Sequence, residues 1–488
     1  MTLRGTAVTP LLSIGIVCGL AAQDVPRRLE PAECPFADEA WTASANIECR
    51  WLVVPQDRSR TTGPTVRLFV VVVRADSPGG TPPLVMLHGG PGASALLPLV
   101  RWGVSQRSSQ RDFVIYDQRG AGLSEPDPCP EYSDRLEQVS AGEPVPLGGS
   151  GRSSLETVAR DCAGSMRSRG IEPAAFGTAA NVADLVDLRL ALGYEHWDIY
   201  GTSYGARLAQ AAIRRDRQGI RAVVLDKPLP PDAEAEAAVA SQQALARIFD
   251  ACASNAACNT RFPNLEQTFI AVFDSLNRTP LTAAAAEGST RPIWLDGGGF
   301  VTTIRRLMRS RVGLTWLPLL LHELNTGDRL RAARQLLRSD ASGRPSRAVF
   351  WLAMCFDDYG PGYLARLDTV RSIVWRPLQN LRDNLEECAI WQTRFAADEE
   401  RSPVVSDIPT LIMSGEFDGR APVEFGQRIA STLSRAWLIV VPGETHGGPL
   451  AGCRATLLLR FIEDPGRRPE AACIGSAPPI EFRTGWPD

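Results

Sequence analysis

A serine between two glycines is the first feature of this chain that could do chemistry. Gly201-Thr-Ser203-Tyr-Gly205 is its only G-x-S-x-G pentapeptide, and an apolar run from Trp197 to Tyr200 precedes it while a helical pattern follows. This order of strand, tight turn and helix is typical of a nucleophile elbow. The glycines leave room for the strained backbone of such a turn. We therefore expect Ser203 to be a nucleophile, the alternative being an ordinary glycine-rich loop.

Two further side chains are needed to activate this serine, a base and an acid that orients the base. In folds that carry such an elbow, the nucleophile, the acid and the histidine follow one another in this order along the chain. The base is then His446, which follows the last expected strand in a glycine-bounded loop. His322 is the fallback. The acid should follow the preceding strand. Asp418 lies there, with Glu416 as the alternative, and we expect Asp418 to hold the second ring nitrogen of His446.

Acyl transfer also requires backbone donors aimed at the developing oxyanion. The loop His88-Gly-Gly-Pro-Gly92 follows an expected strand, and the residue after the nucleophile supplies the second amide. We expect the amides of Gly90 and Tyr204 to form the oxyanion hole; the alternative for the loop is a tight turn that only redirects the chain. Asp117 and Arg119 are expected to brace neighbouring loops, and we assign them no chemistry.

The elements that must position these side chains alternate along the chain. Apolar runs rich in β-branched residues and bounded by turn residues predict strands, and residues 181–192 have helical spacing. Strands that alternate with helices predict an α/β fold with a mostly parallel central sheet covered by helices on both faces. The expected strands are residues 49–54, 66–74, 84–88, 113–116, 197–200, 222–225, 410–413 and 437–441.

A long segment interrupts this alternation before the last two strands. It is rich in alanine, leucine and arginine and has mostly helical periodicity, for example at 234–252, 302–308 and 327–337. We interpret it as an inserted helical cap, because no Gly/Ser- or Pro-rich linker flanks both ends as a separate domain would require. The expected organisation is a signal peptide (1–22), a first part of the hydrolase core (23–228), the cap (229–403) and a second part of the core with the acid and the histidine (404–488).

The N-terminus predicts export. Arg4 is followed by a mostly apolar run from Pro10 to Ala22 and then by polar residues, which is typical of a secretory signal peptide. The run is too short to cross about 30 Å of hydrocarbon as a helix. We expect a secreted or periplasmic protein with no stable membrane insertion after signal removal. Lipoprotein anchoring at Cys18 is the alternative, although the residue before it, Val17, is not the small residue expected there.

Cysteine usage agrees with export. Ten of the eleven cysteines remain after removal of Cys18, and an oxidising compartment lets them pair. A metal site is the competing explanation, but no cysteine pair has C-x2-C spacing and no histidine lies close to one, so we expect neither a metal nor a cofactor. Pairing in sequence order closes only short loops, and it gives Cys34 with Cys49, Cys129 with Cys162, Cys252 with Cys258, Cys355 with Cys388 and Cys453 with Cys473.

Composition bounds the remaining possibilities. The 488 residues are 44% hydrophobic, which is enough for a large core. The net charge of -3 arises from interspersed acidic and basic residues without a basic stripe, so nucleic acid is not an expected partner.

Together these motifs resemble a known family. The loops at 88–92, 117–120, 201–205 and 415–418, with a cysteine-bearing C-terminal region, are similar to the exported prolyl and tripeptidyl aminopeptidase branch of the α/β-hydrolases. The resemblance extends from about Val53 to Cys473. It implies the α/β-hydrolase fold, and the family's triad positions fall on Ser203, Asp418 and His446.

The resemblance also implies a site for the substrate amine. In relatives, acidic residues of the cap hold the free amino terminus of a peptide through strong charge-assisted hydrogen bonds. The segment Met354-Cys-Phe-Asp357-Asp358 resembles that pattern and makes Asp357 the candidate, with Asp358 next. The chain departs from the family at Thr445, where glycine is more usual, and after Asp226, where Lys-Pro replaces Gly-Val at the entrance to the cap.

The expected function is that of an exported serine aminopeptidase, which cleaves peptides near a free N-terminus through an acyl-enzyme on Ser203. A carboxylesterase with the same triad is the first alternative. A non-catalytic binding protein on a hydrolase fold is the second, and the intact triad argues against it.

Overall fold

The computed structural model describes residues 27–42, 45–60, 62–77, 79–94, 96–135, 152–232, 237–283, 293–338, 347–358, 388–391, 395–476 and 479–486. The expected signal peptide, residues 1–22, lies outside this part of the chain, as do several segments of the expected cap.

One large sheet is the centre of the described structure, with the strand order β1-β2-β3-β5-β4-β6-β7-β10-β11. The pairs from β1 to β5 are antiparallel, and those from β5 to β11 are parallel. The strands β4, β5 and β10 are buried along their whole length, which is why they read as continuous apolar runs. The strands are β1 Arg28–Pro31, β2 Ile47–Pro55, β3 Thr65–Val73, β4 Leu84–Leu87, β5 Phe113–Tyr116, β6 Trp197–Thr202, β7 Ile220–Asp226, β10 Thr410–Gly415 and β11 Ala436–Val441.

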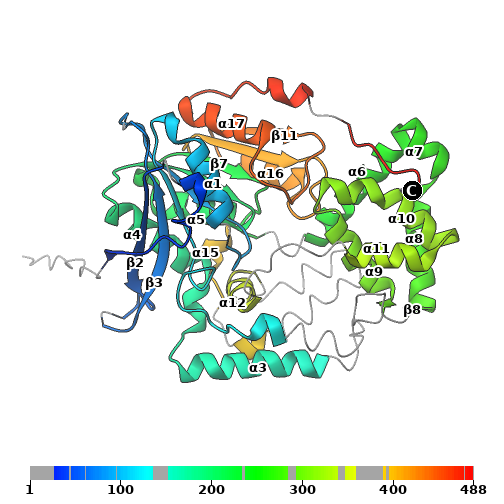
Figure 1. The fold of residues 1–488 in the computed structure, drawn as a ribbon, viewed down its shortest axis with the longest axis horizontal. Coiled ribbons are helices and arrows are strands. Elements are labelled where there is room, and N and C mark those ends of the chain that lie inside the picture. The colour runs from blue at the N-terminus through cyan, green and yellow to red at the C-terminus, as the bar shows by residue number, and fades with distance from the viewer. Residues whose placement is uncertain are drawn as a thin grey trace, which may run out of the picture.

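Helices cover both faces of this sheet (Figure 1). One apolar core joins the sheet to α4, α5 and α16, and a second joins its other face to α1 and α17. The expected fold class, α/β with a mostly parallel sheet between helical layers, is confirmed. The covering helices are α1 Leu96–Ser105, α4 Thr178–Ala191, α5 Tyr204–Arg215, α16 Val423–Ala430 and α17 Gly452–Glu463.

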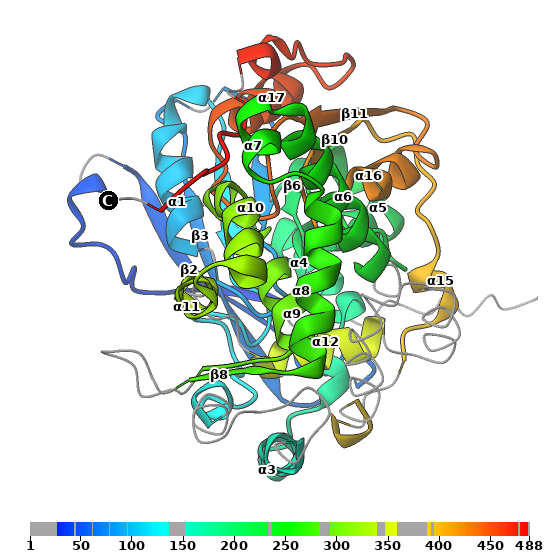
Figure 2. The ribbon, with the colours of Figure 1, turned by 90° about the vertical axis from the view of Figure 1, so that its right-hand side faces the viewer.

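Residues 237–283 and 293–338, which lie between β7 and β10 in sequence, form their own helical group beside the sheet, at the right of Figure 1 and facing the viewer in Figure 2. Its helices share an apolar core to which the sheet contributes little. Its elements are α6 Ala237–Ser254, α7 Ala256–Arg261, α8 Leu265–Arg278, the hairpin β8 Leu281–Ala283 and β9 Ile293–Leu295, α9 Gly297–Leu307, α10 Arg311–Thr326 and α11 Arg329–Arg338.

A further apolar cluster packs α3 (Arg152–Ser168) against α12 (Arg347–Asp357). Two disulfides stabilise it, Cys129 with Cys162 and Cys355 with Cys388. All five disulfides of the structure join cysteines in sequence order, as the sequence analysis suggested. Five bridges are typical of proteins that fold in an oxidising compartment.

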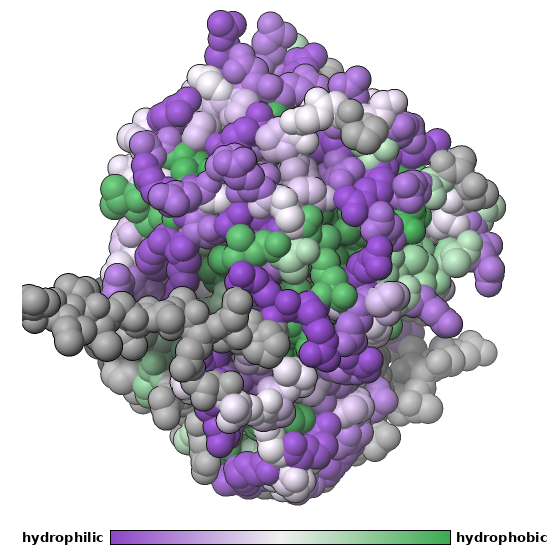
Figure 3. All heavy atoms as spheres, turned by 90° about the vertical axis from the view of Figure 1, so that its left-hand side faces the viewer, coloured by the Kyte–Doolittle hydropathy of each residue, from purple (hydrophilic) through white to green (hydrophobic). Residues whose placement is uncertain are grey.

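The surface on the side of β2 and β3 is mixed, with hydrophobic side chains gathered near its centre among hydrophilic ones (Figure 3). Among the described residues, no helix combines the length and the apolar character needed to cross a membrane.

Candidate active site

Ser203 lies in the sharp turn between β6 and α5. Its φ of 55° and ψ of -119° are strained values for a residue with a side chain. A Cβ atom at Gly201 would lie 2.4 Å from the carbonyl oxygen of Gly205, and one at Gly205 would lie 2.2 Å from the carbonyl oxygen of Leu87. Glycine is therefore required at both positions, and the turn presents the serine hydroxyl at the carboxyl edge of the sheet.

The structure brings His446 to this hydroxyl from 243 positions away in sequence. Its Nε2 lies 2.9 Å from Ser203 Oγ, and its Nδ1 lies 2.9 and 3.0 Å from the two carboxylate oxygens of Asp418. The fallback histidine, His322, lies in α10, where its ring packs 5.4 Å from that of Phe262. The sequence-predicted serine, histidine and aspartate thus form one continuous hydrogen-bonded chain.

Asp418 is fully buried and is held as a carboxylate. Burial raises the pKa of Asp418, but the charge of His446, the hydrogen bond from its ring and those from two backbone amides outweigh it, so the pKa is below its ordinary value. The amides are those of Arg420 and Ala421, at 2.8 and 2.7 Å. A buried carboxylate that stays ionised can fix the imidazole tautomer and stabilise an imidazolium.

Glu416, the alternative acid, has another partner. Its carboxylate accepts the amide of Gly443 at 2.8 Å, and Gly443 begins the turn before His446. The two acids of this loop thus have different contacts: Asp418 meets the ring of His446, and Glu416 holds the backbone that leads to it.

The glycine loop after β4 lies directly against the nucleophile. A Cβ atom at Gly89 would lie 2.8 Å from Cβ and 3.3 Å from Oγ of Ser203. Gly90, the next residue, has a φ of 131°, which favours glycine. The amide of Tyr204 belongs to the first residue of α5, so no carbonyl of that helix can accept from it. Both amides of the expected oxyanion hole therefore come from segments that adjoin Ser203.

Asp117 braces this region. Its carboxylate accepts from the hydroxyl of Ser94 at 2.8 Å and from the amide of Leu123 at 3.0 Å. The following residue, Gln118, donates its side-chain amide to the carbonyl of His88 at 3.0 Å. The loop after β5 therefore supports the glycine loop after β4.

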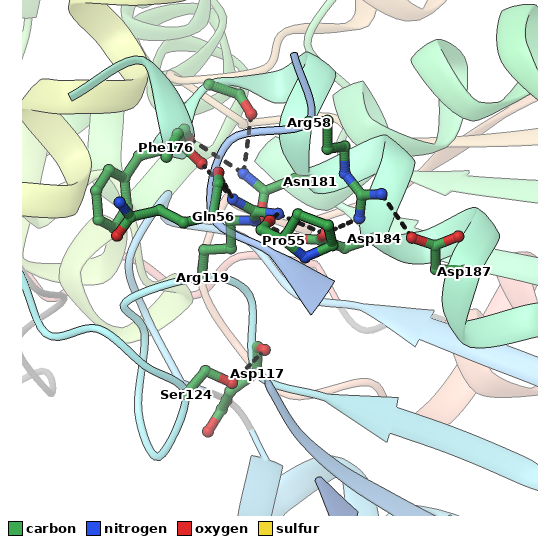
Figure 4. Close-up of polar contacts among 12 residues, drawn as sticks. Pro55, Gln56, Arg58, Asp117, Arg119, Ser124, Phe176, Asn181, Asp184 and Asp187 are labelled. Carbon is green, nitrogen blue, oxygen red and sulfur yellow. Dashed lines mark hydrogen bonds and ion pairs between the residues drawn. The ribbon is translucent and has the colours of Figure 1, made fainter. Parts of the chain in front are cut away.

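Arg119 is buried. Figure 4 shows its polar contacts, which are with structural groups. It binds the carboxylate of Asp184 with two nitrogens at 2.5 and 2.8 Å and the carbonyls of Pro55 and Gln56 at 2.8 and 2.7 Å. These contacts tie β2 to α4 and agree with the bracing role expected from the sequence.

Asp357 and Asp358, the candidates for the substrate amine, are buried at the end of α12. Asp358 binds the guanidinium of Arg207 at 2.6 Å. Asp357 accepts the hydroxyl and the amide of Thr178 at 2.6 and 3.2 Å, and burial raises its pKa despite the charge of Arg207 and the bonds from Thr178. The Thr178 hydroxyl lies 3.0 Å from the hydroxyl of Tyr204, so Asp357 is linked to the residue that follows the nucleophile.

Asp357 also borders a cavity of about 280 Å³ between α4, α5 and the segment that contains α15 (Asp398–Arg401). Its lining includes Thr178, Arg207 and Pro231. None of the described lining residues is Ser203, His446 or Asp418.

The sequence analysis gave no role to Lys227, although it noted the departure from the family there. This residue follows β7, and its ammonium lies beneath the loop of His446. The available signal was that the chain contains no other lysine.

A strained serine, a histidine and a buried aspartate in hydrogen-bond contact at the carboxyl edge of a mostly parallel sheet are the features of an α/β-hydrolase. Residues 82–449 match the alpha/beta hydrolase fold family. The chain therefore belongs to this family and is a hydrolase by descent.

Proteins similar in sequence to this chain include peptidases, as the resemblance of its motifs implied. A tripeptidyl aminopeptidase of Streptomyces lividans is 28% identical over 204 residues, which are 39% of this chain and 37% of that enzyme. The serine protease Hip1 of Mycobacterium bovis is 28% identical over 52% of each chain. The chain thus matches less than two thirds of the length of either relative. The putative hydrolase YuaR of Escherichia coli is 22% identical over 97% of each chain.

Among solved structures, a proline iminopeptidase from Mycobacterium smegmatis aligns with 85% of this chain and 98% of its own, at 15% identity and a TM-score of 0.42. The suspected membership of an α/β-hydrolase family that contains such peptidases is confirmed by the family match and the sequence relatives.

Proposed function

We propose that this protein is an exported serine aminopeptidase that cleaves peptides near a free N-terminus. The observation that carries the proposal is the contact of 2.9 Å between Ser203 Oγ and His446 Nε2, with Asp418 on the other ring nitrogen. Similarity to a tripeptidyl aminopeptidase and to a serine protease supports a peptide rather than another acyl substrate. Five disulfides support an oxidising destination.

In the proposed reaction, Ser203 Oγ attacks the carbonyl carbon of the scissile bond while its proton moves to His446 Nε2. The oxyanion of the tetrahedral intermediate accepts from the amides of Gly90 and Tyr204. His446 then gives the proton to the leaving amine, and the C–N bond breaks. Water attacks the carbonyl carbon of the acyl-enzyme and gives a proton to His446. The ester bond to Ser203 Oγ then breaks, and His446 returns the proton to Oγ. Asp418 stabilises the imidazolium in both halves.

Asp357 is the proposed partner of the substrate amine. Its carboxylate borders a cavity and is linked through Thr178 to Tyr204, whereas Asp358 already neutralises Arg207. Burial of the Asp357 carboxylate costs free energy. A charge-assisted hydrogen bond from the ammonium of a substrate would offset that cost.

One assay set tests the proposal. Wild type and Ser203→Ala are compared on peptide anilides with a free N-terminus, on their N-acetylated versions and on short p-nitrophenyl esters. The proposal expects the wild type to hydrolyse the unblocked peptides and Ser203→Ala to lose that activity. Turnover of esters without turnover of peptides would contradict it and favour a carboxylesterase. Equal inactivity of both proteins on every substrate would favour a binding function.

A further inference from the structure

Lys227 is unusual in its identity, its backbone and its burial. Of the 52 lysine and arginine residues, it is the single lysine. Its φ of 53° lies in the left-handed region, which residues with a side chain rarely adopt. The residue is 1% exposed. Strained backbone of this kind persists where the surrounding structure requires it and gathers at functional sites.

The ammonium of Lys227 holds the loop that carries His446. Its Nζ donates to the backbone carbonyls of His446 at 3.1 Å and of Gly447 at 2.7 Å. This loop connects β11 to α17 and has no regular structure of its own. Two bonds to consecutive carbonyls therefore fix the backbone of the histidine from the side of β7.

Opposite charges stabilise the buried ammonium. The carboxylate of Glu444 lies 3.8 Å from Nζ, and that of Asp226 binds Arg454 at 2.6 Å. Burial lowers the pKa of Lys227, while Asp226, Asp418 and Glu444 act in the opposite direction and Arg454 adds to the lowering. The cations Lys227 and Arg454 thus lie together with the carboxylates of Asp226 and Glu444 at the base of the histidine loop.

A second contact holds the same loop from the cap. The carbonyl of Arg309, between α9 and α10, accepts the amide of Gly447 at 2.7 Å and the hydroxyl of Thr445 at 2.9 Å. Lys227 and Thr445, two of the positions at which the chain departs from the family pattern, therefore both act on the segment around His446.

We infer that Lys227 is a positioning residue for His446: it sets the distance of the imidazole from Ser203 by bonding the histidine backbone. The inference rests on one part of the proposed function, the activation of Ser203 by His446, and not on the choice of substrate. The reaction needs Nε2 within hydrogen-bond reach of Oγ, and a misplacement of about 1 Å can cost about 10²-fold in rate. Without Lys227, Asp418 still orients the ring, but the loop carbonyls lose their donor and the imidazole moves relative to the serine.

The test uses a fluorophosphonate, which reacts with a serine activated by histidine whatever the natural substrate. Lys227→Met keeps most of the unbranched side chain and removes its donors, whereas Lys227→Gly removes the ammonium and relieves the φ strain. Arg111→Met is the matched control, because Arg111 is also a buried cation that donates to a carbonyl, that of Pro82 at 2.5 Å, and to a carboxylate, that of Asp198. The rate of Ser203 labelling is measured on folded protein, together with kcat and KM on the best substrate.

Both Lys227 variants are expected to label about 10- to 100-fold more slowly than the wild type and to lose kcat with KM unchanged, while Arg111→Met labels at the wild-type rate. Labelling of Lys227→Met within two-fold of the wild type would overturn the inference. So would full activity of Lys227→Gly, or equal slowing of Arg111→Met. A wild type that labels at Ser203 but hydrolyses no peptide would refute the proposed function and leave this inference standing.

A measurement on the wild-type chain covers the case in which the Lys227 variants do not fold. Lysine labelled with ¹⁵N gives a single Nζ signal, because the chain has one lysine. Phosphonylation of Ser203 alters the contact of His446, so the Nζ signal is expected to shift. A signal that stays unchanged after complete labelling would overturn the inference.

Discussion

The hydroxyl of Thr445 donates to the backbone carbonyl of Arg309 at 2.9 Å, so the residue before His446 is bonded directly to the helical segment between β7 and β10. The loop of the proposed base is therefore shared between two parts of the structure. A change in the segment around Arg309 can reach the imidazole through this contact, without passing through Ser203 or Asp418.

Thr445→Val removes this hydrogen bond at nearly constant volume. A neutral hydrogen bond contributes about 1 kcal/mol, so kcat/KM should fall about five-fold. Thr432→Val is the control, since its hydroxyl also donates to a carbonyl, that of Val404 at 2.7 Å, away from the histidine loop. Steady-state kinetics on both variants check the prediction; equal effects at the two positions would argue against a link to His446.

Asp418→Asn and Glu416→Gln separate the two acids of the loop after β10. An amide at position 418 cannot stabilise the imidazolium and favours the wrong tautomer, so kcat should fall about 10³- to 10⁴-fold. Glu416→Gln keeps an oxygen that can accept from Gly443, and its kcat should fall by less than about ten-fold. The opposite ranking in kcat measurements would assign the role of the acid to Glu416.

Asp357→Asn tests the proposed amine site. A hydrogen bond to a charged group contributes about 1.5–3 kcal/mol, so KM for peptides with a free N-terminus should rise about 10- to 100-fold while N-acetylated peptides are unaffected. If KM rises equally for both peptide classes, the amine is held elsewhere.

Asp358→Asn provides the contrast, because it leaves the buried charge of Arg207 without its carboxylate. Loss of one partner of a buried ion pair costs about 3–5 kcal/mol, so this variant should lose stability in urea unfolding. A stability equal to that of the wild type would show that Arg207 does not depend on Asp358.

The pKa of Lys227 predicts a dependence of stability on pH. Burial lowers the pKa below its ordinary value of 10.5, so folding disfavours the ammonium. Between the folded and the unfolded pKa, the unfolded chain binds more protons than the folded chain, so the free energy of unfolding rises with pH. This gain in stability is complete above pH 10.5. It is lost as the pH falls through the folded pKa of Lys227. The ¹⁵Nζ signal should titrate below 10.5. A midpoint at or above 10.5 would contradict the prediction.

Much of the fold could be predicted because its strands are buried and continuous in hydrophobicity. The strand at 113–116 was placed at the bounds that the structure has, and the others differ from theirs by at most a few residues. The short edge strand β1 and the hairpin of β8 and β9 were missed. These strands are three or four residues long and only partly buried where described, so their alternation is too short to distinguish from a loop.

The candidate site was predictable where local backbone demands particular residues. The glycines around Ser203 are of this kind. Asp418 and His446 could be predicted from their order along the chain, each after one of the last two strands. The role inferred for Lys227 is not, because its partners are carbonyl oxygens more than two hundred positions away, and every residue type offers such a carbonyl. The partners of Asp357 and Asp358 are likewise distant in sequence and could not be identified from spacing.

The central claim is that Ser203 carries the acyl group, and mass spectrometry of a quenched reaction tests it directly. Trypsin releases residues 190–207, in which Ser203 is the one serine. After acid quenching of the wild type with an unblocked peptide anilide, the account predicts this fragment with the mass of the acyl group added at Ser203, and no such fragment from Ser203→Ala. Hydrolysis by Ser203→Ala at the wild-type rate, with no adduct on the fragment of the wild type, would contradict it.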